Sequence, residues 1–219
     1  MKLVVNGTTI PNSSGKVKIN GNSINQLVVN GKTCWFKTSR LVITSSKTII
    51  AGKDFPAGVD VSVCMVGGGA GGKTVYYTDD SSAEGGGHGG VVNTTINYPL
   101  GASVAITIGA GGSRGNNGGT TKIGSKAAGG GTASLFYGRG KSVTTCGGTG
   151  RDGQKEHSDY IGDGYGGGSS GFGNGGRGRT SANGGNGGVG SGGGGALRNQ
   201  FYKYINAGAG GRGQVNLSW

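Results

Sequence analysis

The sequence has few acidic residues, few prolines and no long apolar segment. Its 9 Asp and Glu stand against 21 Lys and Arg, so the net charge is +12. Without a long apolar run no membrane-spanning helix is predicted, and the apolar stretch after Met1 is too short for a signal peptide. No run of five basic residues occurs, so a dedicated nucleic-acid patch is not indicated. Diffuse positive charge nevertheless favours anionic surfaces.

Histidine and cysteine are also scarce, which limits catalysis and metal binding. His88 lies inside a glycine run and is expected to be a surface side chain, whereas His157 has acidic neighbours but no ligand pattern. Cys34, Cys64 and Cys146 are far apart and lack metal-ligand spacing. They are expected to be buried free thiols in a protein made in a reducing cytosol. No catalytic residue, metal or cofactor is predicted.

Glycine is the abundant residue, and its distribution is uneven. The chain has 56 glycines, and only 6 of them precede residue 67. Such density produces motifs by chance. Residues 67–74, GGGAGGKT, match the phosphate-binding loop of nucleotide hydrolases, but no helix pattern follows them. Residues 111–115 match a nucleophile-elbow pattern, and 147–152 match a single Ca²⁺-binding repeat; both lack the required context. The sequence therefore predicts no enzyme.

The first third of the chain repeats the dipeptide Asn-Gly, at residues 6–7, 20–21 and 30–31. This dipeptide tolerates the positive φ of a type I′ turn and is typical of tight hairpins. Residues 1–37 are therefore predicted to form a small β meander, which cannot hold a large core alone. Alternating apolar residues predict further strands. They lie at 41–43, 48–50, 59–66, 91–96, 104–108 and 214–219.

The glycine-rich region, residues 67–219, alternates glycine runs with longer inserts. Disorder is the default for such a composition, but the strands inside the region and at its end need a shared core. Collagen needs glycine strictly at every third position, and that period is absent. The alternative is a bundle of ten polyproline-II-like glycine helices, whose N–H and C=O groups bond to neighbouring helices. The inserts would then be loops at its two ends.

The order of the glycine blocks resembles a known family. The blocks VGGGAGG, GGGHGGVV, VAITIGAGG and GNNGGTTKIG, followed by further GGG runs and a final strand, are similar to the glycine-rich adhesins at the tips of T-even-type bacteriophage tail fibres. They also resemble glycine-rich phage tail proteins more broadly. The resemblance covers roughly residues 45–219. It implies a polyglycine-II sandwich, no enzymatic activity and receptor recognition by loops at the outer end.

These observations give one expected architecture. The fold class is mostly β and irregular, with an N-terminal β meander, a polyglycine-II bundle and a C-terminal strand. Residues 1–45 form an attachment module for the phage tail fibre or tail protein, and residues 46–219 form the receptor-binding domain. The receptor is an outer-membrane protein or lipopolysaccharide, and no nucleic acid is expected. The protein is placed at the tail tip of the virion after synthesis in the host cytoplasm.

Aromatic and basic residues gather in the inserts, where a glycine core leaves them no room. Tyr and Arg on loops are typical of recognition surfaces, although some of these rings could instead cap the bundle. The longest inserts are 73–84, 132–146, 151–165 and 196–206. The candidate receptor-binding residues are Tyr76, Tyr77, Phe136, Tyr137, Arg139, Tyr160, Tyr165, Phe201, Tyr202 and Tyr204.

Two other function classes remain open from the sequence. Gly-Arg-Gly-Arg at 176–179 and Gly-Arg-Gly at 211–213 resemble Arg/Gly-rich nucleic-acid binders, which would be disordered and bind RNA in a salt-sensitive way. A purely structural or ice-binding bundle would have regular, flat repeats with short loops. The long aromatic inserts count against that class.

Overall fold

The structure is a computed structural model. It describes residues 3–5, 8–10, 18–19, 22–23, 26–29, 32–37, 39–76, 82–133, 144–146, 148–149, 156–158, 162–180, 182–198 and 205–219. These residues form strands and extended segments, and no helix occurs among them. The prediction of a mostly β fold is confirmed. The described part of the chain accordingly contains no helix that could cross a membrane.

The N-terminal strands form three hairpins, and each Asn-Gly dipeptide lies between the two strands of a pair. All three pairs are antiparallel. Each is a separate two-stranded sheet, so the predicted single meander is wrong for the described strands. The Asn-Gly signal is local: it specifies each turn but not which hairpin lies beside which. The strands are β1 (Leu3–Val5), β2 (Thr8–Ile10), β3 (Lys18–Ile19), β4 (Asn22–Ser23), β5 (Gln26–Val29) and β6 (Lys32–Phe36).

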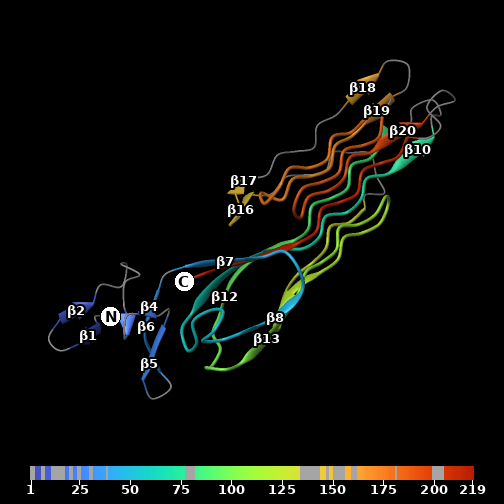
Figure 1. Cartoon of the computed structure of the whole chain (residues 1–219). Coiled ribbons are helices and arrows are strands. Elements are labelled where there is room, and N and C mark those ends of the chain that lie inside the picture. The colour runs from blue at the N-terminus through green and yellow to red at the C-terminus, as the bar shows by residue number, and fades with distance from the viewer. Residues whose placement is uncertain are drawn as a thin grey trace.

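Two four-stranded sheets follow and pack face to face (Figure 1). The first has the order β12-β9-β21-β7 and the second β15-β14-β13-β8. All pairs within them are antiparallel. The strands are β7 (Arg40–Ile43), β8 (Lys47–Ile50), β9 (Val61–Val66), β12 (Val91–Ile96), β13 (Ser103–Thr107), β14 (Thr121–Ile123), β15 (Lys126–Ala128) and β21 (Gln214–Ser218).

The core between the sheets follows from strand alternation. On β9, the side chains of Val61, Val63 and Met65 are fully buried, while Ser62 is exposed. Ile49, Val104, Ile123 and Leu217 come from the other strands to meet them. Burial of large aliphatic side chains contributes about 1.5–3 kcal/mol each, so this small sandwich is the main hydrophobic anchor of the fold.

The predicted strands at 41–43, 48–50, 59–66, 91–96, 104–108 and 214–219 are all present with small shifts at their ends. The pairing of one of these strands affects the predicted boundary between the N-terminal module and the rest of the chain. β7 lies within residues 1–45, yet it pairs with β21 at the other end of the chain. Residues 40–43 therefore belong to the sandwich rather than to the hairpins. The division into two functional modules stays a prediction.

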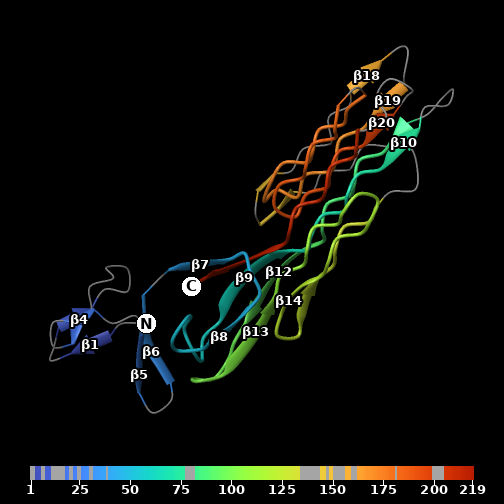
Figure 2. The same cartoon turned by 45° about the vertical axis from the view of Figure 1, so that its right-hand side comes forward.

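The glycine-rich runs leave one end of the sandwich and extend away from it (Figures 1 and 2). Run 67–72 continues β9 outward, and run 85–90 returns to β12. Short strands lie at the far end of these runs. They are β10 (Thr74–Tyr76), β11 (Ser82–Ala83), β18 (Glu156–Ser158), β19 (Gly162–Gly164) and β20 (Ala196–Arg198).

Run 67–72 is buried at the centre of this body, and every one of its amides donates a hydrogen bond to another run. Successive amides donate to three different neighbours, and the order repeats every three residues. The bonds, 2.8 to 3.0 Å long, run from Gly67 to Gly90, Gly68 to Gly119, Gly69 to Gly211, Ala70 to Gly87, Gly71 to Asn116 and Gly72 to Gly208. Its carbonyls accept from three further runs, through Gly112, Gly131 and Gly193. Six runs therefore surround it.

Run 191–195 is a second buried centre beside the first. It bonds to run 67–72 and also to runs 85–90, 165–170, 174–178, 184–188 and 207–213. Within the described residues, the two central runs and their eight neighbours account for ten glycine-rich runs. The outer runs bond to one another as well, for example Gly185 to Arg177 at 2.8 Å. They form a closed shell around the centres.

The close approach of these backbones requires glycine. A Cβ added to Gly69 would overlap the carbonyl of Ser191, and one added to Gly193 would overlap the carbonyl of Gly208. In the outer runs, side chains appear every third residue and point to solvent, as Asn183 and Asn186 do. The Asn186 side-chain oxygen accepts a hydrogen bond from the Ala209 amide at 2.9 Å. It thereby satisfies a donor at the outer surface.

Two glycine stretches differ from the expected runs. Residues 184–195 form two runs, because the chain turns back at Gly190, which has a φ of +64°. Within the stretch 147–150, the described residues 148–149 belong to a hairpin instead of a run. Its strands are β16 (Thr144–Thr145) and β17 (Gly148–Thr149).

That hairpin carries a disulfide bond between Cys146 and Cys64 of β9. The prediction of free thiols is therefore wrong for these two residues. They are 82 residues apart in sequence, but folding brings their Cα atoms to 5.9 Å. Such proximity cannot be read from cysteine spacing.

Candidate functional site

The far end of the glycine-rich runs brings three of the four predicted inserts together. β10, which starts insert 73–84, pairs in parallel with β20, which starts insert 196–206. β11, at the end of insert 73–84, pairs in parallel with β19 in insert 151–165. β18 and β19 lie beside β10 and β20 in both views (Figures 1 and 2). These strand pairs fix the relative positions of the insert roots, which are the residues at which each insert leaves or re-enters the glycine-rich body.

The structure describes two of the ten candidate receptor-binding residues. Tyr76 is the last residue of β10 and stands opposite Arg198 in the strand register. Tyr165 is half-buried, and its amide donates to the Ala83 carbonyl at 2.8 Å, so it lies at the root of insert 151–165. The other eight lie outside the described residues: Tyr77, Phe136, Tyr137, Arg139, Tyr160, Phe201, Tyr202 and Tyr204.

Insert 132–146 differs from the other three. It starts in the bundle, where the Thr132 carbonyl accepts a hydrogen bond from the Gly87 amide at 3.1 Å. Its last residue, Cys146, is bonded to Cys64 in the sandwich. Because Cys64 lies on β9, before run 67–72 leaves the sheet, this insert ends near the sandwich and not at the far end.

Side chains from three separate turns meet beside the insert roots, and sequence reasoning missed them. Arg114 donates from its guanidinium to the side-chain oxygen of Asn206. The Asn206 amide donates to the Asn183 side chain at 2.7 Å. The Ala207 amide donates to the Thr74 hydroxyl at 2.8 Å. This polar belt of Arg114, Asn183 and Asn206 is exposed. Arg114 and Asn183 lie in short turns outside the four long inserts. Asn206 is the last residue of insert 196–206, where only the aromatic residues were predicted to bind the receptor.

Glu84 is an unusual buried acid beneath this end. It follows β11 and is 5% exposed, and its Oε2 atom has no hydrogen-bond partner. Burial raises the pKa of Glu84, and the nearby charge of Lys73 partly opposes that rise. Backbone bonding holds the two residues together, since the Lys73 amide donates to the Glu84 carbonyl at 2.9 Å.

The phosphate-loop match at 67–74 has a structural role. A phosphate would need the free amides of that loop, yet all amides from Gly67 to Gly72 donate to other runs. Lys73 begins an insert and is exposed. No helix follows within the described residues; the next element is β10. The motif is the central run of the glycine-rich body.

His88, predicted as a surface side chain, is half-buried, and its Nδ1 lies 2.8 Å from the Gly89 carbonyl. In the part of the chain that the structure describes, no three His, Cys, Asp or Glu residues are grouped to hold a metal ion. No protein-family model matches the chain, and no curated protein matches it either.

Proposed function

We propose that the protein is a receptor-binding adhesin of a bacteriophage tail, which recognises a bacterial outer-membrane protein or lipopolysaccharide through the inserts at the far end of its glycine-rich body. The observation that carries this proposal is the pairing of β10 with β20 and of β11 with β19. Inserts far apart in sequence thereby leave the body at one end. A rigid scaffold that presents variable loops at one end suits recognition.

The runs themselves are proposed to be polyglycine-II helices. A helix with three residues per turn directs successive amides to three sides, and the amides of run 67–72 donate to three neighbours in a three-residue order. The overlap that a Cβ would cause at Gly69 and Gly193 supports backbone-to-backbone packing. Such a body has almost no side chains that could rearrange. Sequence changes in its loops should therefore have little effect on the packing of the sandwich.

The described surface at the far end is basic and polar. Lys73, Arg114, Asn183 and Asn206 are exposed there, while the acidic Glu84 is buried beneath. Cationic and amide side chains suit anionic, hydroxyl-rich glycans such as the phosphorylated core of lipopolysaccharide. The predicted Tyr and Phe anchors in the inserts would add contact area around this belt.

An exchange of inserts tests the proposal. Inserts 73–84, 151–165 and 196–206 would be replaced together by those of a related phage protein with a different host, and adsorption would be measured on both hosts. We expect host range to follow the inserts, because the strands at their roots fix only their position. A matched variant would exchange residues 132–146 alone, with Cys146 retained so that its bond to Cys64 is kept, and it should keep the original host.

If the triple exchange assembles normally but retains the original host range, the far end is not the recognition surface. If host range follows residues 132–146 instead, recognition lies on the flank of the molecule near Cys64.

A further inference from the structure

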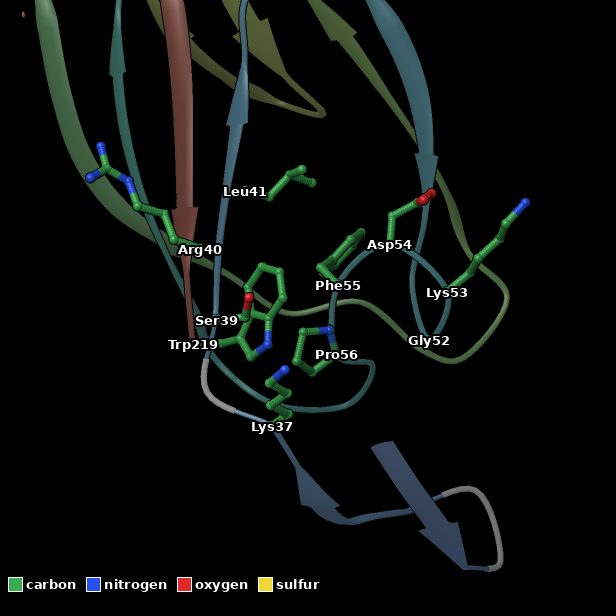
Figure 3. Close-up of a pocket in the computed structure, with 10 residues that line it drawn as sticks. All are labelled: Lys37, Ser39, Arg40, Leu41, Gly52, Lys53, Asp54, Phe55, Pro56 and Trp219. Atoms are coloured by element: carbon green, nitrogen blue, oxygen red, sulfur yellow. The ribbon is translucent and has the colours of Figure 1, made fainter. Parts of the chain in front are cut away.

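A narrow slot lies at the end of the sandwich opposite the glycine-rich runs. It has a cavity volume of about 220 Å³ and lies between the start of β7, the turn at 52–56 and Trp219. Figure 3 shows the rings of Trp219, Pro56 and Phe55 gathered at its centre with Leu41 above them. Phe55 is buried and packs edge-on against Tyr98, with ring centroids 6.4 Å apart. The apolar floor of the slot is therefore fixed by the core.

The rim of the slot is positively charged. Lys37, Arg40 and Lys53 are exposed around it, and no ion pair involves them within the described residues. Among the described residues that line the slot, the one acid is Asp54, which accepts a hydrogen bond from the Ile50 amide at 2.7 Å. That hydrogen bond holds the Asp54 carboxylate against the backbone of the turn at 52–56. In Figure 3 the charged ends of Arg40 and Lys53 extend outward on opposite sides, and Lys37 lies beside Trp219.

Two open sheet edges border the same place. Among the strands that the structure describes, β7 is the last of one sheet, with β21 on one side only, and β8 is the last of the other sheet. On β7, Ile43 is buried, whereas Val42 is 47% exposed. An unpaired edge next to an apolar slot is the arrangement that accepts an extended peptide as an added strand, with one side chain in the slot.

We propose that this slot binds an extended, acidic segment of a partner protein, with an apolar side chain between Trp219 and Phe55 and flanking Asp or Glu residues against Lys37, Arg40 and Lys53. The charge of the rim selects the acidic partner, and the open edge of β7 favours a polypeptide over a glycan. The slot lies at the opposite end of the molecule from inserts 73–84, 151–165 and 196–206, through which the receptor is proposed to bind. The inference therefore does not depend on what the far end binds.

Peptide titration of the full-length chain tests this. The probes are three synthetic peptides with the same Leu-Phe centre, flanked by Asp and Glu, by Ser, or by Lys; a heparin fragment serves as an anionic glycan. A Trp35→Phe background leaves Trp219 as the only tryptophan, so its fluorescence reports occupancy of the slot. We expect the acidic peptide to bind at least tenfold more tightly than the Ser peptide at low salt, and the Lys peptide not to bind.

Charge reversal provides the matched control. Lys53→Glu changes an exposed turn residue at the slot, just after β8. Lys126→Glu makes the same change on an exposed residue of β15, at the opposite edge of the sheet that contains β8. Lys53→Glu should weaken binding of the acidic peptide about tenfold, and Lys126→Glu should leave the Kd of that peptide unchanged. Equal binding of the acidic and Ser peptides, equal effects of the two variants, absence of binding, or tighter binding of heparin than of the acidic peptide would each overturn the proposal.

Discussion

Gly193 donates its amide to the carbonyl oxygen of Ala70 over 2.9 Å, and this bond joins the two buried runs around which the glycine-rich body is built. Neither residue contributes a large side chain. The contact is one of backbone with backbone, so it depends on the absence of a Cβ at Gly193 and at the glycines facing it. The stability of the glycine-rich body therefore depends on backbone hydrogen bonds of this kind.

Alanine substitution of a central glycine should therefore be severe. Gly193→Ala would place a methyl group on the Gly208 carbonyl, which is itself held by a hydrogen bond from the Gly72 amide. We therefore expect a loss of about 3 kcal/mol or more in the free energy of unfolding. Gly129→Ala is the matched control, since nothing lies within 4 Å of its added Cβ. It should change stability by about 0.5 kcal/mol or less. Thermal unfolding of both variants measures this, and similar losses would contradict the packing described.

Nucleotide should not bind at residues 67–74. The amides of Gly67–Gly72 donate to other runs, and releasing them would break the centre of the body. We expect calorimetric titration with Mg²⁺-ATP to give no micromolar binding, and Lys73→Ala to behave as the unmodified chain does. Micromolar binding that Lys73→Ala removes would restore the phosphate-loop interpretation.

Glu84 should make stability depend on pH. Its pKa is raised in the folded state, so the folded chain holds the proton more tightly than the unfolded chain does. The corresponding stabilisation is complete below the usual carboxyl pKa of 4.5 and is lost as pH rises through the higher folded value. Glu84→Gln removes this loss. At pH 8 we expect the variant to be more stable by about 1 kcal/mol, and near pH 3.5 we expect no advantage.

Denaturant unfolding of both proteins at the two pH values checks the Glu84 prediction. The quantity compared is the difference in unfolding free energy between the variant and the unmodified protein, so the contributions of other titrating groups cancel. An advantage that is constant across pH would show that the substitution acts through packing and not through charge.

The Cys64–Cys146 bond should stabilise the chain by about 2–4 kcal/mol, because it closes a long loop in the unfolded state. Cys146→Ser should lower the free energy of unfolding by that amount under oxidising conditions and should have no effect under reducing conditions. Cys34→Ser is the control, and its effect should be the same under oxidising and reducing conditions. Alkylation followed by mass spectrometry should label one cysteine before reduction and three after it. Three labelled cysteines before reduction would contradict the disulfide.

The sequence by itself determined the elements whose signal is local. The Asn-Gly dipeptides at 6–7, 20–21 and 30–31 predicted antiparallel pairing of the strands on either side of them, and alternating apolar residues predicted β9, β12 and β21. It also contained an unused signal for the outer runs. Residues 183, 186 and 189 are non-glycine at every third position, with glycine pairs between them. A single outward face on a helix of three residues per turn produces that pattern.

Only the tertiary structure decided which runs lie at the centre, which turns meet at the far end and which cysteines pair. Backbone hydrogen bonds between glycines leave no mark in side-chain chemistry. The sequence could therefore argue against a phosphate loop at 67–72, because no helix pattern follows it, but it could not show that this run lies at the centre of the body. Arg114, Asn183 and Asn206 share a surface because their runs are neighbours, although up to 92 residues separate them. The slot at Trp219 likewise forms only when the last strand returns beside the first strand of the sandwich.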